Sequence, residues 1–175
     1  MTSKIALDAS DKFLRDFRQH LHQVDEIANV ILRGHLEIER HLDTVLDLIF
    51  FRPEHFRKIR LEFSDKIRLA KSYCPNPDAR DWTVIKCLNE ARNSIAHHRS
   101  ERARATKVAA IRQSISGFGT PDFQREVREA DDKEMIVLAA AVASGFLAFV
   151  ESSVQEVREV IAASLDVPNP RKEAD

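Results

Sequence analysis

The amino-acid sequence predicts an all-α fold, an up-and-down helical bundle, from two observations. Apolar residues recur at steps of three and four along most of the 175 residues, and no segment alternates convincingly as a strand. Only 4 glycines and 6 prolines are present, too few for the many turns of an all-β protein. A chain of this length forms one domain, which we expect over residues 1–166, followed by a disordered tail at 167–175.

The first helical stretch is expected over residues 11–50, with Ser10 as its N-terminal cap. Its apolar residues keep the helical spacing, and no proline interrupts them before Pro53. The stretch is therefore either one long helix or two helices joined near Gly34.

Shorter elements are expected in the middle of the chain. A short helix or turn over 54–60 precedes a helix over 65–73, for which Ser64 is a suitable N-terminal cap. Two prolines within 74–78 then break the chain, because each removes an amide donor and disfavours helix just before it. The next helix begins at about residue 79.

The C-terminal half is expected to contain two more helices. Residues 101–113 have a helical and basic pattern, and two glycines with a proline in 116–121 indicate a loop. The last helix is expected over 131–165. These extra C-terminal helices complete the predicted bundle.

Charge is nearly balanced overall but uneven along the chain. The net charge of -1 argues against a protein that coats nucleic acid by bulk charge alone. Residues 92–112 nevertheless carry six Lys or Arg against one acid, and residues 52–71 carry seven cations against three acids. Acidic residues gather instead around 122–134. A basic surface is therefore plausible, although a charge run is usually a solvated face.

Several functional classes find no support in the sequence. The 2 cysteines form neither a disulfide framework nor a metal-binding spacing, and we expect no metal site and no cofactor. The histidines at 20, 22, 35 and 41 are expected to be solvated. The most apolar run, 135–150, is shorter than the roughly 20 residues of a membrane span. We therefore expect a cytoplasmic protein without a membrane segment.

One motif combines residues suited to phosphate chemistry. Arg92 is followed directly by Asn93, and four residues separate Arg92 from His97. A guanidinium can hold phosphate oxygens in its planar fork, and an imidazole titrates near neutral pH and can move protons. This pairing favours a phosphodiester as substrate.

Helix geometry limits how this motif can act. In an intact helix Arg92 and His97 lie about 140° apart around the axis, so they do not share a face, whereas Asn93 and His97 do. A shared site requires the helix to end near His97 or a second subunit to contribute. Arg92 lies against the apolar stripe and needs a partner, because a lone buried charge is costly. We predict an ion pair with Glu39 that orients Arg92 beside His97.

The motif also resembles a known family. The letters LNEARNSIAHH at 88–98 look like the signature helix of the HEPN superfamily, in which an Arg is followed after four to six residues by a His. The letters FSDKIRLA at 63–70 resemble HEPN-like proteins of the mannitol operon repressor type. The resemblance covers about residues 32–98, and the rest matches only as additional helices.

The resemblance implies a small helical domain that dimerises so that two motifs face one cleft. Catalytically active members are metal-independent ribonucleases. On this chain, Arg92 would stabilise developing charge on the phosphate, and His97 would transfer protons at the ribose 2′-OH or the leaving oxygen. Asn93 would orient His97 or the phosphate, with His98 and Glu39 as supporting residues.

Two functions stay open from the sequence. In the first, the chain is a ribonuclease of toxin or defence type, with Arg99, Arg102 and Arg104 as RNA contacts beside the motif. In the second, it is a non-catalytic interaction or regulatory module, because many HEPN proteins are inactive binding or dimerisation domains. A third arrangement, a complex with an antitoxin or regulatory protein, is compatible with either.

Overall fold

The computed structural model describes residue 12 and residues 25–97 and 100–165. Within these ranges all regular structure is helical, which confirms the all-α bundle. The helices are α2 (Glu26–Ile49), α3 (Pro53–Phe56), α4 (Phe63–Tyr73), α5 (Asp81–Ala96), α6 (Glu101–Ile115), α7 (Pro121–Glu129) and α8 (Asp132–Leu165). The predicted start at residue 11 with its Ser10 cap, and the predicted tail at 167–175, lie outside the described residues.

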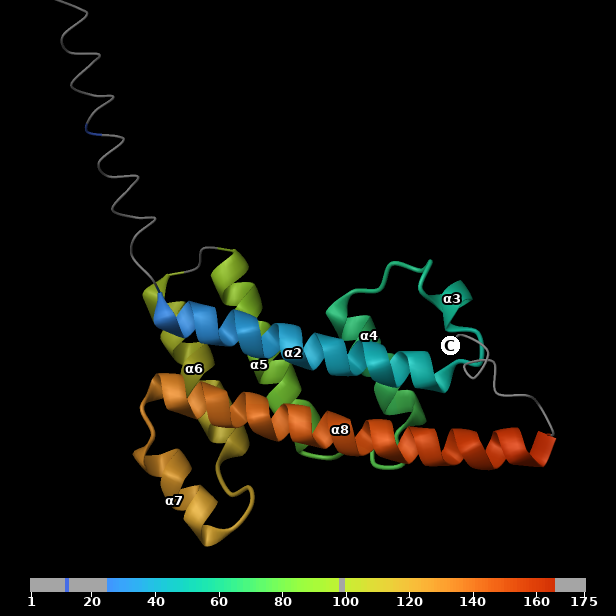
Figure 1. Cartoon of the computed structure of the whole chain (residues 1–175). Helices are drawn as coiled ribbons and strands as arrows, with labels where there is room; N and C mark the ends of the chain where they lie inside the picture. The colour runs from blue at the N-terminus through green and yellow to red at the C-terminus, as the bar shows by residue number, and fades with distance from the viewer. Residues whose placement is uncertain (1–11, 13–24, 98–99, 166–175) are drawn as a thin grey trace, which may run out of the picture.

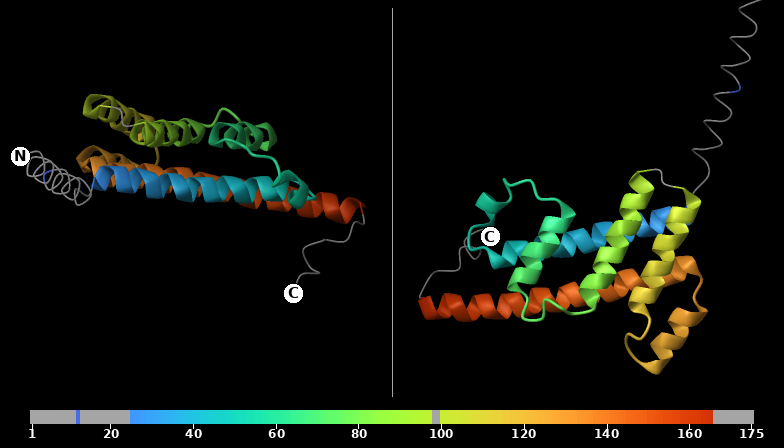
Figure 2. Two further views of the ribbon diagram at one scale, coloured as in Figure 1. Left: turned by 90° about the horizontal axis from the view of Figure 1, so that it is seen from above. Right: turned by 180° about the vertical axis from the view of Figure 1, so that it is seen from behind.

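The helices form two layers (Figures 1 and 2). The two longest, α2 and α8, lie side by side in one layer, and α4, α5 and α6 cross one face of this pair. The long helices run in the same direction. Lys133 Nζ near the start of α8 contacts Glu26 Oε2 at 2.8 Å, and Arg158 near its end contacts Leu48 O at 2.8 Å. The second layer therefore rests on a parallel pair.

The apolar spacing of the sequence places the core between the two layers. Buried residues of α2 recur every three or four positions, at Ile31, His35, Ile38, Leu42 and Val45. The same spacing is found on α8, at Ala139, Ala143, Leu147, Val150 and Val154. Each helix thus buries one stripe, as expected for amphipathic helices in a layered α protein.

Several predicted boundaries are confirmed and others are corrected. α2 continues through Gly34 without a break, and α8 begins and ends close to the predicted 131–165. Ser64 is not a cap, because α4 begins at Phe63, and the preceding Glu62 donates its backbone N–H to Asp65 Oδ2 at 3.4 Å.

Helix α7 was not predicted from the sequence. Thr120 caps this helix by accepting a hydrogen bond from the Phe123 N–H at 3.3 Å, and Pro121 occupies its first turn. A capping threonine followed by proline is a recognisable start signal for a helix. The two glycines in 116–121 obscure this signal, because they indicate a loop.

Two glycines in the long helices differ in what surrounds them. A Cβ placed on Gly34 of α2 would meet the Ala140 Cβ of α8 at 3.0 Å, whereas a Cβ on Gly145 would meet nothing within 4 Å. Gly145→Ala is therefore expected to raise the free energy of unfolding by about 0.5–1 kcal/mol, since glycine disfavours a helix interior. Gly34→Ala should stabilise the protein less, or destabilise it, because the added Cβ would force α8 to shift at Ala140. Urea unfolding followed by circular dichroism measures both, and equal stabilisation would contradict the close α2–α8 contact.

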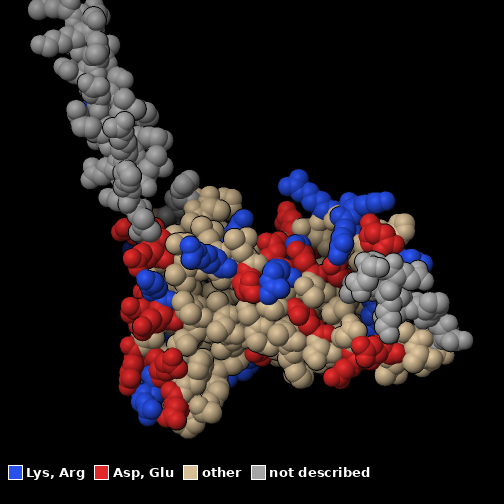
Figure 3. All heavy atoms as spheres, viewed as in Figure 1, with Lys and Arg blue, Asp and Glu red and all other residues tan. Residues whose placement is uncertain are grey.

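The outer face of α8 is apolar. Val137 and Phe149 are 51% and 69% exposed. Figure 3 shows a broad area without charged residues in the middle of this side of the molecule. By length and composition, Asp132–Ser164 could also cross a membrane. Core helices of water-soluble proteins meet the same criterion, so this property is weak evidence for either environment.

Candidate functional site at the C-terminal end of α5

The motif Arg92–His97 occupies the last turn of α5 and its cap. The helix ends at Ala96, and His97 is the C-terminal cap, with φ -96° and ψ 16°. Its backbone N–H donates to Asn93 O at 3.1 Å, and its side chain is exposed. The helix thus ends where a shared Arg/His site requires it to end.

Arg92 and Asn93 lie on the half-buried flank of the same turn. Arg92 Nη1 donates to Asn93 Oδ1 at 3.1 Å. The predicted Glu39–Arg92 ion pair is not formed among the described residues. Instead, Lys66 of α4 donates to Glu39 Oε1 at 2.9 Å and also contacts Asp43 Oδ1 at 2.7 Å. Sequence spacing placed Glu39 on a suitable face of α2, but could not show that α4 brings Lys66 to that carboxylate.

Beside this pair lies a polar contact that the sequence did not predict. His35, expected to be solvated, is only 5% exposed, and its Nε2 lies 3.1 Å from Asn89 Oδ1 on α5. The centroid of its ring is 4.3 Å from that of Phe63. His41 is also partly buried, with Nδ1 2.6 Å from Glu151 Oε1 of α8. The available signal was spacing, since His35 falls four residues after a buried isoleucine and three before another.

Burial lowers the pKa of His35 below its usual value of 6.5, and Asn89 opposes this shift through its hydrogen bond. The charged groups near the ring are Glu39 on its own helix, which raises the pKa, and Arg92 of α5 and Lys66 of α4, which lower it. The neutral imidazole is therefore the form that the folded protein favours.

This shift has a consequence for stability. The unfolded chain binds a proton at His35 near pH 6.5, whereas the folded protein binds it only at lower pH. The free energy of unfolding therefore falls as the pH drops below about 6.5, until the lowered pKa of the folded protein is reached. Above pH 6.5 the contribution of His35 is constant. We expect the melting temperature of the wild type to fall more steeply than that of His35→Gln between about pH 7.5 and about pH 5.5. Differential scanning calorimetry checks this, and identical pH dependence in the two proteins would contradict it.

The cations predicted as RNA contacts differ in their availability. Arg99 and His98 lie outside the described residues, and Arg102 is exposed on α6. Arg104 is engaged with the Asp25 carboxylate at the start of α2. Of the three predicted contacts, the structure therefore leaves Arg102 accessible and places Arg104 in an ion pair between helices.

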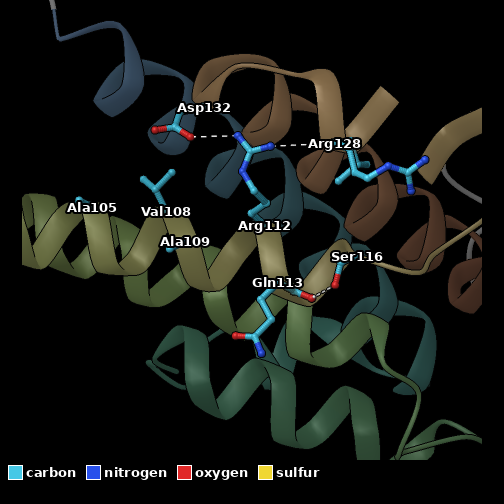
Figure 4. A pocket seen from close by; sticks show the side chains of 9 residues that line it. Ala105, Val108, Ala109, Arg112, Gln113, Ser116, Arg128 and Asp132 are labelled. Atoms are coloured by element: carbon cyan, nitrogen blue, oxygen red, sulfur yellow. Dashed lines mark hydrogen bonds and ion pairs between the residues drawn. The ribbon is translucent and has the colours of Figure 1, made fainter. Parts of the chain in front are cut away.

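Two further cations of α6 are also used within the fold. Lys107 Nζ donates to Glu90 Oε2 of α5 at 2.8 Å. Arg112 donates to Val127 O at 2.8 Å, Ala130 O at 3.1 Å and Asp132 Oδ1 at 3.0 Å. Figure 4 shows its contact with Asp132. These contacts satisfy carbonyl groups at the end of α7, which a helix terminus leaves without partners. The pocket around Arg112 is thus explained by the packing of α7.

A groove of about 530 Å³ runs between α4 and α5. Both helices pack against α2, and the groove between them reaches Asn89, one turn before Arg92. Its walls carry cations from both helices, Arg68 and Lys71 on α4 and Lys86 on α5. The groove therefore leads toward the motif from the N-terminal half of α5.

The described residues contain no group of three or more His, Cys, Asp or Glu side chains arranged to hold a metal ion. Comparisons with protein-family models, curated proteins and solved structures found no match to this chain. The chemistry of the site must therefore be argued from its own residues: an exposed imidazole at a helix end, preceded on the same turn by an amide and a half-buried guanidinium.

Proposed function

We propose that this chain is a HEPN-like helical protein that cleaves RNA without a bound metal, at a cleft formed by a homodimer. The observation that carries the proposal is the end of α5 at Ala96, which leaves His97 exposed at the cap within the motif. The Arg92–Asn93 hydrogen bond then holds the guanidinium at the same helix end. The up-and-down HEPN arrangement, with α6–α8 as added helices, belongs to this proposal.

In the proposed reaction the ribose 2′-oxygen bonds to phosphorus while the bond from phosphorus to the 5′-oxygen breaks. One proton leaves the 2′-OH and one reaches the 5′-oxygen, and His97 performs one of these transfers. Arg92 stabilises the negative charge that develops on the phosphate oxygens. Asn93 orients the imidazole or the phosphate, with His98 as a supporting residue.

A second candidate function is a non-catalytic interaction or regulatory module of the mannitol operon repressor type. It is favoured by the pairing of α6 cations with acids of the fold, as in Arg104 with Asp25 and Lys107 with Glu90. In this case the motif structures a dimer or docks a regulatory protein or antitoxin. For both functions we propose a cytoplasmic location.

Incubation of the purified chain with total RNA in the presence of a metal chelator separates the two functions. The ribonuclease proposal expects RNA fragments that accumulate with time. Intact RNA with a folded, dimeric protein would favour the interaction module. The oligomeric state should be measured on the same sample, because the proposed cleft needs two copies.

A further inference from the structure

We propose that the groove between α4 and α5 binds single-stranded RNA and guides it toward His97. The inference rests on the proposed function, since it identifies the form of RNA that the same site receives. It assigns a role to Lys71, Lys86 and Arg68, which the motif itself does not use.

The groove offers cations that are free to meet phosphates. Lys86 is 72% exposed and lies 3.9 Å from Glu90, while Arg68 is 79% exposed with Asp65 as its partner within its own helix. Such exposed pairs are weak and can be exchanged for a phosphate contact. Lys71 has no ion pair among the described residues. The groove therefore has cations on both walls.

Acidic groups near the groove are partly neutralised. Glu90 accepts from Lys107 at 2.8 Å, so a cation of α6 already compensates its charge. Asp78 is the remaining carboxylate of the lining, at the N-terminal end of the groove. This leaves Arg68, Lys71 and Lys86 as the charged groups of the lining that are available to a polyanion.

The path continues along one face of α5. Lys86, Asn89, Asn93 and His97 recur at steps of three and four, so they form one polar stripe on the helix. The eleven positions from Lys86 to His97 rise about 16 Å along the axis. That length corresponds to roughly five stacked nucleotides at 3.4 Å each. A strand in the groove would thus reach the exposed imidazole.

The lining favours a single strand. Ile67 and Ala79 give the groove an apolar part that can meet bases, whereas a duplex exposes mainly phosphates. Trp82, at 4% exposure, also lines the groove, and its indole N–H has no acceptor among the described residues. A positively charged groove that follows the backbone is one of the two parts of sequence-tolerant single-strand binding, and the other is a surface that meets the faces of the bases.

The test measures binding separately from cleavage. A fluorescently labelled oligouridylate with 2′-O-methyl groups lacks the attacking hydroxyl, so the full-length wild type can bind it but cannot cleave it. The variant Lys71→Glu/Lys86→Glu is compared with Arg125→Glu/Arg128→Glu on α7, which changes the net charge equally. Arg125 is a suitable control because it pairs with an acid of its own helix, Asp122, as Lys86 does with Glu90.

We expect the groove variant to bind roughly tenfold to 100-fold more weakly, with a salt slope smaller by about 1.4, since each lost phosphate contact removes about 0.7 on a single strand. The α7 variant should stay within about threefold of the wild type. Equal weakening of both variants, or no binding by the wild type, would overturn the inference. Binding with these differences but no cleavage of ordinary RNA would instead refute the proposed nuclease and leave the groove as an RNA site.

Discussion

Replacing Arg158 with leucine is expected to lower the free energy of unfolding by about 3 kcal/mol. Arg158 of α8 is only 8% exposed, and its Nη1 donates to Leu48 O at 2.8 Å and Phe50 O at 3.0 Å at the end of α2. The last carbonyl groups of a helix have no partner within it. The guanidinium also lies over the Phe51 ring, 5.2 Å from its centroid. Leucine would leave the buried Leu48 carbonyl and the partly buried Phe50 carbonyl without this donor.

Urea unfolding followed by circular dichroism measures this loss. Arg158→Lys keeps the charge but not the planar fork, so its stability should fall between wild type and leucine. Arg125→Leu, on the exposed surface of α7, should change the free energy of unfolding by about 0.5 kcal/mol or less. A leucine variant as stable as the wild type would show that α2 does not depend on this cap from α8.

Replacing His97 with alanine is expected to slow RNA cleavage by about 100-fold to 10,000-fold, the usual contribution of a group that transfers protons. The side chain is exposed at the end of α5, so the melting temperature should change little. The rate is measured on a defined single-stranded RNA in chelator, with protein in excess over substrate.

The matched control is His55→Ala on α3, because His55 is also exposed, at 74%, and lies outside the motif. It should cleave at the wild-type rate. Equal losses in the two histidine variants would point to a general effect of charge or folding. A His97 variant that melts at a much lower temperature would assign this residue to structure instead of chemistry.

The sequence predicted best the features that depend on a single helix, such as its position and its buried face. The apolar spacing along 131–165 predicted α8 almost to the residue, and the spacing along 11–50 agrees with α2 where the structure describes it. The proline pair in 74–78 correctly separated α4 from α5. Periodicity reports how one segment buries its own stripe, and that information is local.

Partners across helices were not predictable in the same way. Periodicity placed Glu39 at the edge of the α2 core face, but only the packing of α4 shows that Lys66 meets it instead of Arg92. The burial of His35 likewise depends on Phe63 and Asn89 from two other helices. The end of α5 at Ala96 was recognised as a requirement of the site, but its position came from the structure.

The central claim is that Arg92 and His97 act as one RNA-cleaving site, and a double-mutant cycle tests it most directly. Single-turnover cleavage rates in chelator are compared for wild type, Arg92→Ala, His97→Ala and the double variant. Residues that act together lose their effect together, so the double variant should be only about as slow as the slower single variant. Losses that multiply across the two positions, or a wild type that leaves RNA intact, would contradict the claim.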